Sequence, residues 1–169
     1  MCHTALIDLV VMDYLYNKFP QANSGQLSWA RSRTVCSPAL ALVAVKRLKL
    51  HKLLLVNNVE LSTAIGRYVP VLEEISEEDM IKNGWKHDPP KALSDVFESV
   101  LGAVLVDTQY NLDKTIGIVQ HVMWDMLETL SPDLPRDPVS QLMVWAAKAG
   151  CRQISFRFMH SPTIIEKPH

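Results

Sequence analysis

The 169-residue sequence predicts an all-α fold that ends in a short helix and strand. Apolar residues recur at helical spacing in successive segments, and prolines or capping residues mark where these segments begin and end. One short segment, residues 153–158, alternates as a strand does. The stretch 131–138 contains three prolines in eight residues, which is typical of a linker. We therefore expect one domain over residues 1–135 and a smaller part over 136–169.

Composition describes an ordinary globular protein, with 48% hydrophobic and 21% charged residues. The formal net charge of -1 gives no overall attraction to nucleic acid, so any such binding must come from local patches. The three cysteines lie far apart and lack the paired spacing of a metal site. This pattern indicates free thiols in a reducing compartment. No apolar run reaches membrane-spanning length and no signal peptide is evident. We expect an intracellular protein, cytoplasmic or nuclear, with no membrane partner.

The first predicted helix covers residues 4–18 and ends at Phe19-Pro20, because the residue before a proline avoids the α conformation. Apolar residues cover most of its surface. Such a helix is usually buried on two sides, either within a core or against a second subunit.

A polar loop is predicted for residues 21–26, and Pro38 begins a helix that runs to His51. The densest basic cluster of the chain lies at the end of that helix, and it consists of Lys46, Arg47, Lys49, His51 and Lys52. Contact with the phosphates of duplex RNA is one interpretation. A solvated helix end is the other, since lysines are favoured at the negative pole of the helix dipole.

The next helix is predicted over residues 61–75, with a kink at Pro70. Ser76 has the spacing of a capping box and begins an acidic run, which we expect to be a short, exposed turn of helix. After residue 107, Asn111 or Asp113 can cap a further helix that reaches residue 130.

Residues 88–107 form the most apolar long segment of the chain. Asp88 can cap a helix whose first residue is Pro89, because proline has a preset φ and no N–H to leave unpaired there. The remainder is apolar almost all round, which predicts a helix buried in a bundle.

Three charged residues of this segment, Lys91, Asp95 and Glu98, follow one another at i, i+4 and i+7 and so share one stripe of the helix. Two carboxylates one turn apart form half a site for a hard divalent cation, which requires anionic oxygen ligands. A solvated acidic face near a helix N-terminus is the alternative.

Residues 90–103, Pro-Lys-Ala-Leu-Ser-Asp-Val-Phe-Glu-Ser-Val-Leu-Gly-Ala, resemble the second conserved motif of the ribonuclease III family. Within that family they are most similar to the C-terminal ribonuclease III domain of Dicer-type enzymes, including fungal Dicer-like proteins. The Asp and Glu of the motif hold catalytic Mg²⁺ in the family, with Mn²⁺ as an alternative, and its Lys lies beside the site. The resemblance therefore assigns catalytic roles to Asp95, Glu98 and Lys91, the first two as metal ligands.

Residues 5–16 resemble the second half of the family's first signature, Glu-x-x-Leu-Gly-Asp-Ala followed by apolar residues and Leu-Tyr. Thr4 stands where the family has its catalytic Asp, and the Glu one turn earlier would precede Met1. The chain thus supplies two of the family's four acidic ligands. Asp8 is a poor substitute, because one helical turn displaces a carboxylate by about 5 Å.

Residues 27–32, Leu-Ser-Trp-Ala-Arg-Ser, resemble the family's next helix, Leu-Thr-x-Leu-Arg-Ser, which lies near the RNA. The resemblance therefore adds weight to the RNA interpretation of the basic residues. The predicted RNA-binding set is Arg31, Lys46, Arg47, Lys49 and Lys52.

The resemblance implies the all-helical ribonuclease III fold over residues 1–135, and the partial start of a double-stranded-RNA-binding-like module within 136–169. It implies a Mg²⁺-dependent endoribonuclease that hydrolyses double-stranded RNA in Dicer-like RNA processing and silencing. Because family domains work in pairs, it also implies a homodimer or a pseudo-dimer with another ribonuclease III domain. The chain begins inside one motif and ends inside another module, so we interpret it as a fragment with impaired activity. A catalytically inactive ribonuclease III-fold protein that binds RNA or a partner is the alternative.

Overall fold

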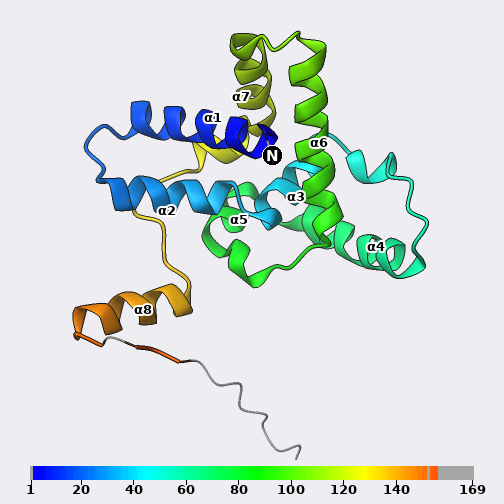
Figure 1. The fold of residues 1–169 in the computed structure, drawn as a ribbon. Helices are drawn as coiled ribbons and strands as arrows, with labels where there is room; N and C mark the ends of the chain where they lie inside the picture. Colours follow the sequence, from blue (N-terminus) through cyan, green and yellow to red (C-terminus); the bar gives the residue numbers. More distant parts are fainter. Residues whose placement is uncertain (1, 152, 156–169) are drawn as a thin grey trace, which may run out of the picture. The chain divides into compact units, whose positions relative to one another are not determined.

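A computed structural model of the chain describes residues 2–151 and 153–155, with the backbone alone for residues 2–4. This part of the chain holds eight α-helices, two 3₁₀ turns and no strand (Figure 1). The elements are α1 (Cys2–Lys18), α2 (Ser24–Thr34), α3 (Ser37–Lys46), η1 (Leu50–Lys52), α4 (Val59–Glu74), α5 (Glu77–Asn83), η2 (Gly84–Lys86), α6 (Lys91–Asp107), α7 (Leu112–Glu128) and α8 (Pro138–Lys148). The all-α prediction is confirmed.

The chain divides into two compact units, Met1–Pro135 and Arg136–His169. Within the second unit, α8 is the single helix of the residues described. Residues 153–155, the first half of the predicted strand, have no regular structure, and residues 156–158 lie outside the described part. None of the helices described combines the length and apolarity needed to cross a bilayer.

Helix α3 is the centre of the first unit, with every residue from Ala39 to Val45 buried. It packs most extensively against α6 and also against α4 and α5. Its three alanines (Ala39, Ala41 and Ala44) have side chains small enough for these neighbours to approach closely. Helix α1 lies beside α2 and also contacts α6 and α7 (Figure 1). Its inner face is buried, whereas Leu9 and Tyr16 are 51% and 67% exposed.

The start of α6 differs from the prediction, because Asp88 does not cap it. The helix begins at Lys91, and Pro90 occupies the N-cap position without a side-chain hydrogen bond. Pro89 precedes a second proline, and a residue before proline is disfavoured in the α conformation, so the helix cannot begin there. The backbone N–H of Asp88 instead donates to the Tyr68 hydroxyl of α4 at 2.7 Å.

Two other helix ends also differ from the sequence prediction. Helix α2 begins at Ser24, inside the predicted loop, because Asn23 and Gln26 form a capping box. Helix α3 ends at Lys46 instead of continuing to His51. The chain turns at Lys49, whose φ is 52°, and so brings Leu50 into the core.

The remaining helices follow the prediction more closely. Pro70 lies inside α4, Ser76 caps α5 by accepting the N–H of Asp79, and Asn111 caps α7. Helix α5 is not simply exposed, however, since Met80 and Ile81 are fully buried.

Candidate active site and nucleic-acid interface

The predicted catalytic stripe lies on the first two turns of α6. On the opposite face of these turns, Leu93 and Phe97 have no exposed surface, and this burial fixes how the helix is rotated about its axis. Asp95 and Glu98 are consequently held at the surface, Asp95 with 49% of its side chain exposed and Glu98 partly buried.

Lys91 is bonded to one of these two carboxylates and influenced by the charge of the other. Its Nζ donates a hydrogen bond to Oδ1 of Asp95, four residues later on the same helix. This hydrogen bond, together with the negative charges of Asp95 and Glu98, raises the pKa of the Lys91 ammonium. Both acids therefore act on one cation that stays protonated at neutral pH, so the three predicted residues are close in space. Glu98 is also engaged in an interaction of its own.

Asp8 does not join this site. Its carboxylate accepts a hydrogen bond from Nη1 of Arg31 at 2.7 Å, between α1 and α2. No group of three or more His, Cys, Asp or Glu side chains is arranged around a common metal position among the residues described. Two carboxylates nevertheless suit Mg²⁺, which usually keeps several waters and takes one or two carboxylates together with substrate phosphates. The two carboxylates of Asp95 and Glu98 thus fit a cation whose remaining coordination positions are filled by water and by substrate phosphates.

Comparison with known proteins decides the family. Residues 4–109, which run from α1 through the whole of α6, match the sequence profile of the Ribonuclease III domain. The chain belongs to the ribonuclease III domain family. The resemblance noted for residues 90–103 is confirmed at this level.

Three relatives illustrate the match. The ribonuclease III chain is 34% identical over 125 residues to endoribonuclease Dicer homolog 2 of Arabidopsis thaliana, covering 73% of this chain and 9% of that protein. It is 32% identical over 111 residues to protein Dicer of Schizosaccharomyces pombe, covering 64% and 8%. It is 30% identical over 153 residues to ribonuclease 3 of Pelotomaculum thermopropionicum, covering 90% and 54%. The chain therefore spans under a tenth of these two Dicer proteins and about half of the bacterial relative.

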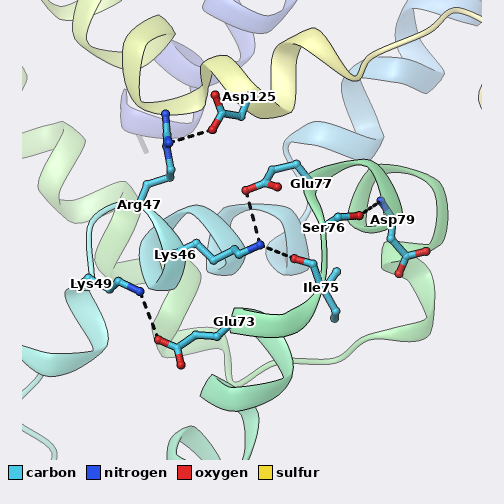
Figure 2. A network of polar contacts seen from close by, with 9 residues as sticks. All are labelled: Lys46, Arg47, Lys49, Glu73, Ile75, Ser76, Glu77, Asp79 and Asp125. Atoms are coloured by element: carbon cyan, nitrogen blue, oxygen red, sulfur yellow. Dashed lines mark hydrogen bonds and ion pairs between the residues drawn. The ribbon is translucent and has the colours of Figure 1, made fainter.

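The basic cluster of this ribonuclease III domain is largely paired with acids of the same chain (Figure 2). The ion pairs join Lys46 to Glu77 at 3.8 Å, Arg47 to Asp125 at 2.9 Å and Lys49 to Glu73 at 3.3 Å. Lys46 also donates to the carbonyl of Ile75 at 2.6 Å. These contacts tie the end of α3 to α4, α5 and α7. They lower the net charge of the surface on which RNA binding was predicted.

The other members of the predicted interface differ in their surroundings. Arg31 is held by Asp8, with about a third of each side chain exposed. Lys52 is exposed and forms no ion pair or hydrogen bond through its side chain with any residue described. Nδ1 of His51 is buried without a hydrogen-bond partner in the described structure, and this burial lowers the pKa of the imidazole, which favours its neutral form. RNA contact by this set stays a prediction.

Sequence analysis missed Arg67, which lies close to the predicted site. Arg67 and Tyr68 of α4, together with Lys91 at the start of α6, line a surface depression of about 650 Å³. A single arginine in the middle of an amphipathic helix belongs to no motif and to no run of basic residues. Only the packing of α4 beside the 88–91 segment reveals where Arg67 lies.

Proposed function

We propose that this chain is a ribonuclease III-type endoribonuclease domain that hydrolyses double-stranded RNA, as in Dicer-like RNA processing. The observation that supports it is the pair of carboxylates, Asp95 and Glu98, at the surface of α6. The opposite face of this helix is buried in the core, and the helix lies within the residues that match the family. The proposed cofactor is Mg²⁺, with Mn²⁺ as an alternative. When bound, the cation would supply an activated water and stabilise the leaving oxygen.

The side chains of the chain itself have separate tasks in this proposal. Asp95 and Glu98 bind the cation through oxygen. Lys91 holds the Asp95 carboxylate in one orientation and neutralises part of its charge while the metal is absent. Phe97 and Leu93 anchor the helix beneath them, so that the oxygens do not drift.

Metal binding by the chain alone is expected to be weak. A cation must compete with the Lys91 ammonium for Asp95, and two carboxylates leave most of a six-fold shell to water. RNA phosphates would fill part of that shell, so RNA and cation should bind cooperatively. Weak cleavage by the isolated chain follows from this dependence.

The proposed partners are double-stranded RNA and a second ribonuclease III domain, in a homodimer or a pseudo-dimer, within the cytoplasm or the nucleus. Exposed Leu9 and Tyr16 on α1 support a paired state, because large apolar side chains on one helix face favour association.

A second candidate function is that of a catalytically inactive ribonuclease III-fold protein that binds RNA or a partner nuclease. It is favoured by the ion pair between Lys91 and Asp95, which satisfies the carboxylate without a metal, and by the absence of a third metal-binding side chain among the residues described.

The test is cleavage of an end-labelled RNA duplex by the purified 169-residue chain with Mg²⁺ or Mn²⁺. We expect slow cleavage that Asp95→Asn and Glu98→Gln each abolish. Glu74→Gln, which changes an exposed acid on a different helix, α4, should have no effect. Cleavage that survives the double substitution of Asp95 and Glu98 would refute the proposed site. Duplex binding without cleavage under either metal would instead support the second candidate.

A further inference from the structure

The depression beside the start of α6 has walls from three separate elements. Ser37 at the start of α3, Arg67 and Tyr68 of α4, and the 88–91 segment surround a volume of about 650 Å³. Pockets that bind small ligands typically measure about 300–1,000 Å³, so the space admits a group the size of a nucleotide.

The charged groups that line the depression are Arg67, Lys91 and Asp88. The charge of Lys91 is already compensated by its ion pair with Asp95, so Arg67 is the cation of the depression that could bind an added anion. Arg67 is exposed and makes no hydrogen bond or ion pair with any residue that the structure describes, although Arg31 and Arg47 both have carboxylate partners. An exposed guanidinium without an acidic partner is available to an external anion such as a phosphate. Guanidinium also matches phosphate geometry, because its N–H groups bind two oxygens at once.

The remaining walls are flat and apolar. The Tyr68 hydroxyl accepts the backbone N–H of Asp88 at 2.7 Å, which holds the phenol ring in place between α4 and the 88–91 segment. Ala64, Pro89 and Pro90 form the apolar surface around it. Duplex RNA is recognised mainly through its phosphates and ribose 2′-hydroxyl groups, which a guanidinium and a nearby phenol can contact.

Lys91 connects this depression to the predicted catalytic stripe. The residue lines the depression, and its ammonium bonds to Asp95. Lys91 therefore belongs both to the depression and to the predicted catalytic stripe.

We propose that the depression binds the sugar-phosphate backbone of the RNA strand next to the nucleotide that is cleaved, with Arg67 as a positioning residue for a phosphate and Tyr68 in contact with a ribose. The inference rests on the proposed function, since it names the substrate group that lies beside Asp95 and Glu98. It concerns binding, and binding is measurable without cleavage.

The test measures binding of an RNA duplex by the complete chain in EDTA. The readout is the fluorescence anisotropy of the labelled RNA at several salt concentrations. Arg67→Gln should weaken binding about two- to fivefold, as loss of an exposed ion contact does. It should also reduce the slope of log K against log salt by about 0.9, the amount expected for one lost phosphate contact. Arg67→Lys should restore the slope because it restores the charge, and Tyr68→Leu should weaken binding without changing the slope.

The matched control is Lys114→Gln, which removes one positive charge from an exposed position of α7 that has no side-chain partner among the residues described. We expect it to leave affinity and slope close to those of the unchanged chain. Urea unfolding of Arg67→Gln should match the unchanged chain as well, because the side chain is exposed.

The inference is overturned if Arg67→Gln and Lys114→Gln weaken binding equally, if Arg67→Gln leaves the salt slope unchanged, or if the unchanged chain does not bind the duplex at low salt. Cleavage that depends on Asp95 but not on Arg67 would refute this inference while leaving the proposed function intact. If Arg67→Gln weakens binding but the unchanged chain never cleaves the duplex, this inference stands and the proposed catalytic function fails.

Discussion

Arg33 offers a direct test of what holds the first unit together. The residue is 6% exposed, and its guanidinium donates from Nε to the carbonyl of Ile81 and from Nη2 to that of Lys82, both at 3.0 Å. These two carbonyls belong to the last turn of α5, where no intrahelical donor is available. Arg33 therefore caps α5 from α2 and places a positive charge at the negative end of its dipole.

Replacing Arg33 by Met keeps most of the aliphatic volume and removes both hydrogen bonds. A hydrogen bond to a charged group contributes about 1.5–3 kcal/mol, so two give about 3–6 kcal/mol. Because the Lys82 carbonyl is only partly buried and water can replace its donor, we expect a loss near the lower end, about 3 kcal/mol. Arg33→Lys should lose less, since the charge stays near the helix end but the ammonium lacks the rigid, separated N–H groups with which the guanidinium reaches both carbonyls.

The assay is urea unfolding with circular dichroism as the readout. Arg33→Met should lower the midpoint without changing the dependence of the free energy on urea, because the surface exposed on unfolding stays the same. Arg67→Met provides the control with the same residue types at an exposed position, where we expect a change within about 0.5 kcal/mol. If the two Met variants unfold at the same urea concentration, the carbonyl contacts of Arg33 do not stabilise the fold.

Three further predictions concern backbone strain, a helix cap and thiol reactivity. Gln109 has a φ of 55°, so Gln109→Gly should raise the free energy of unfolding by about 0.5 kcal/mol, and a lower melting temperature for the variant would contradict this. Burial raises the pKa of Asp137, but the hydrogen bonds it accepts from Ser140 outweigh this effect, and the net pKa lies below its ordinary value. The cap should therefore stabilise α8 above about pH 4 and be lost as the pH falls through the folded-state pKa; a Ser140 amide NMR shift that does not titrate in this range would argue against it. Burial raises the pKa of the Cys36 thiol, whereas Cys151 is exposed, so a thiol reagent at pH 8 should label Cys151 before Cys36; peptide mass mapping that finds equal rates for these two would count against this.

Two helix starts were predicted from a side chain within three residues, although the equally local capping box of Asn23 and Gln26 at the start of α2 was missed. Asn111 and Ser76 cap their helices through acceptors that the sequence displays. The start of α6 was not predicted, because the Pro-Pro step forbids the helix at Pro89 and a hydroxyl twenty residues away holds Asp88. The end of α3 depends on burying Leu50, which is a property of the assembled core.

The candidate site divides in the same way. Lys91 and Asp95 are four residues apart on one helix, so their contact follows from helical geometry alone. The partner of Asp8 lies 23 residues away on another helix, and no local pattern identifies it. Arg67 was missed for this reason too, since it lines the same depression as Lys91 only because α4 folds back beside the 88–91 segment.

The density of basic residues along the sequence is therefore a poor guide to which cations of this domain lack an acidic partner. Arg47 lies in the densest basic run, yet its guanidinium is 2.9 Å from Asp125, so a phosphate must displace that carboxylate or meet a nearly neutral pair. Arg67 stands alone in the sequence, but a phosphate that binds it displaces no partner that the structure describes. Because contact with phosphates depends on uncompensated charge, the change in salt slope should be larger for Arg67→Gln than for Arg47→Gln. A larger change for Arg47→Gln would mean that its ion pair with Asp125 opens when RNA binds, and that the run of basic residues is the true interface.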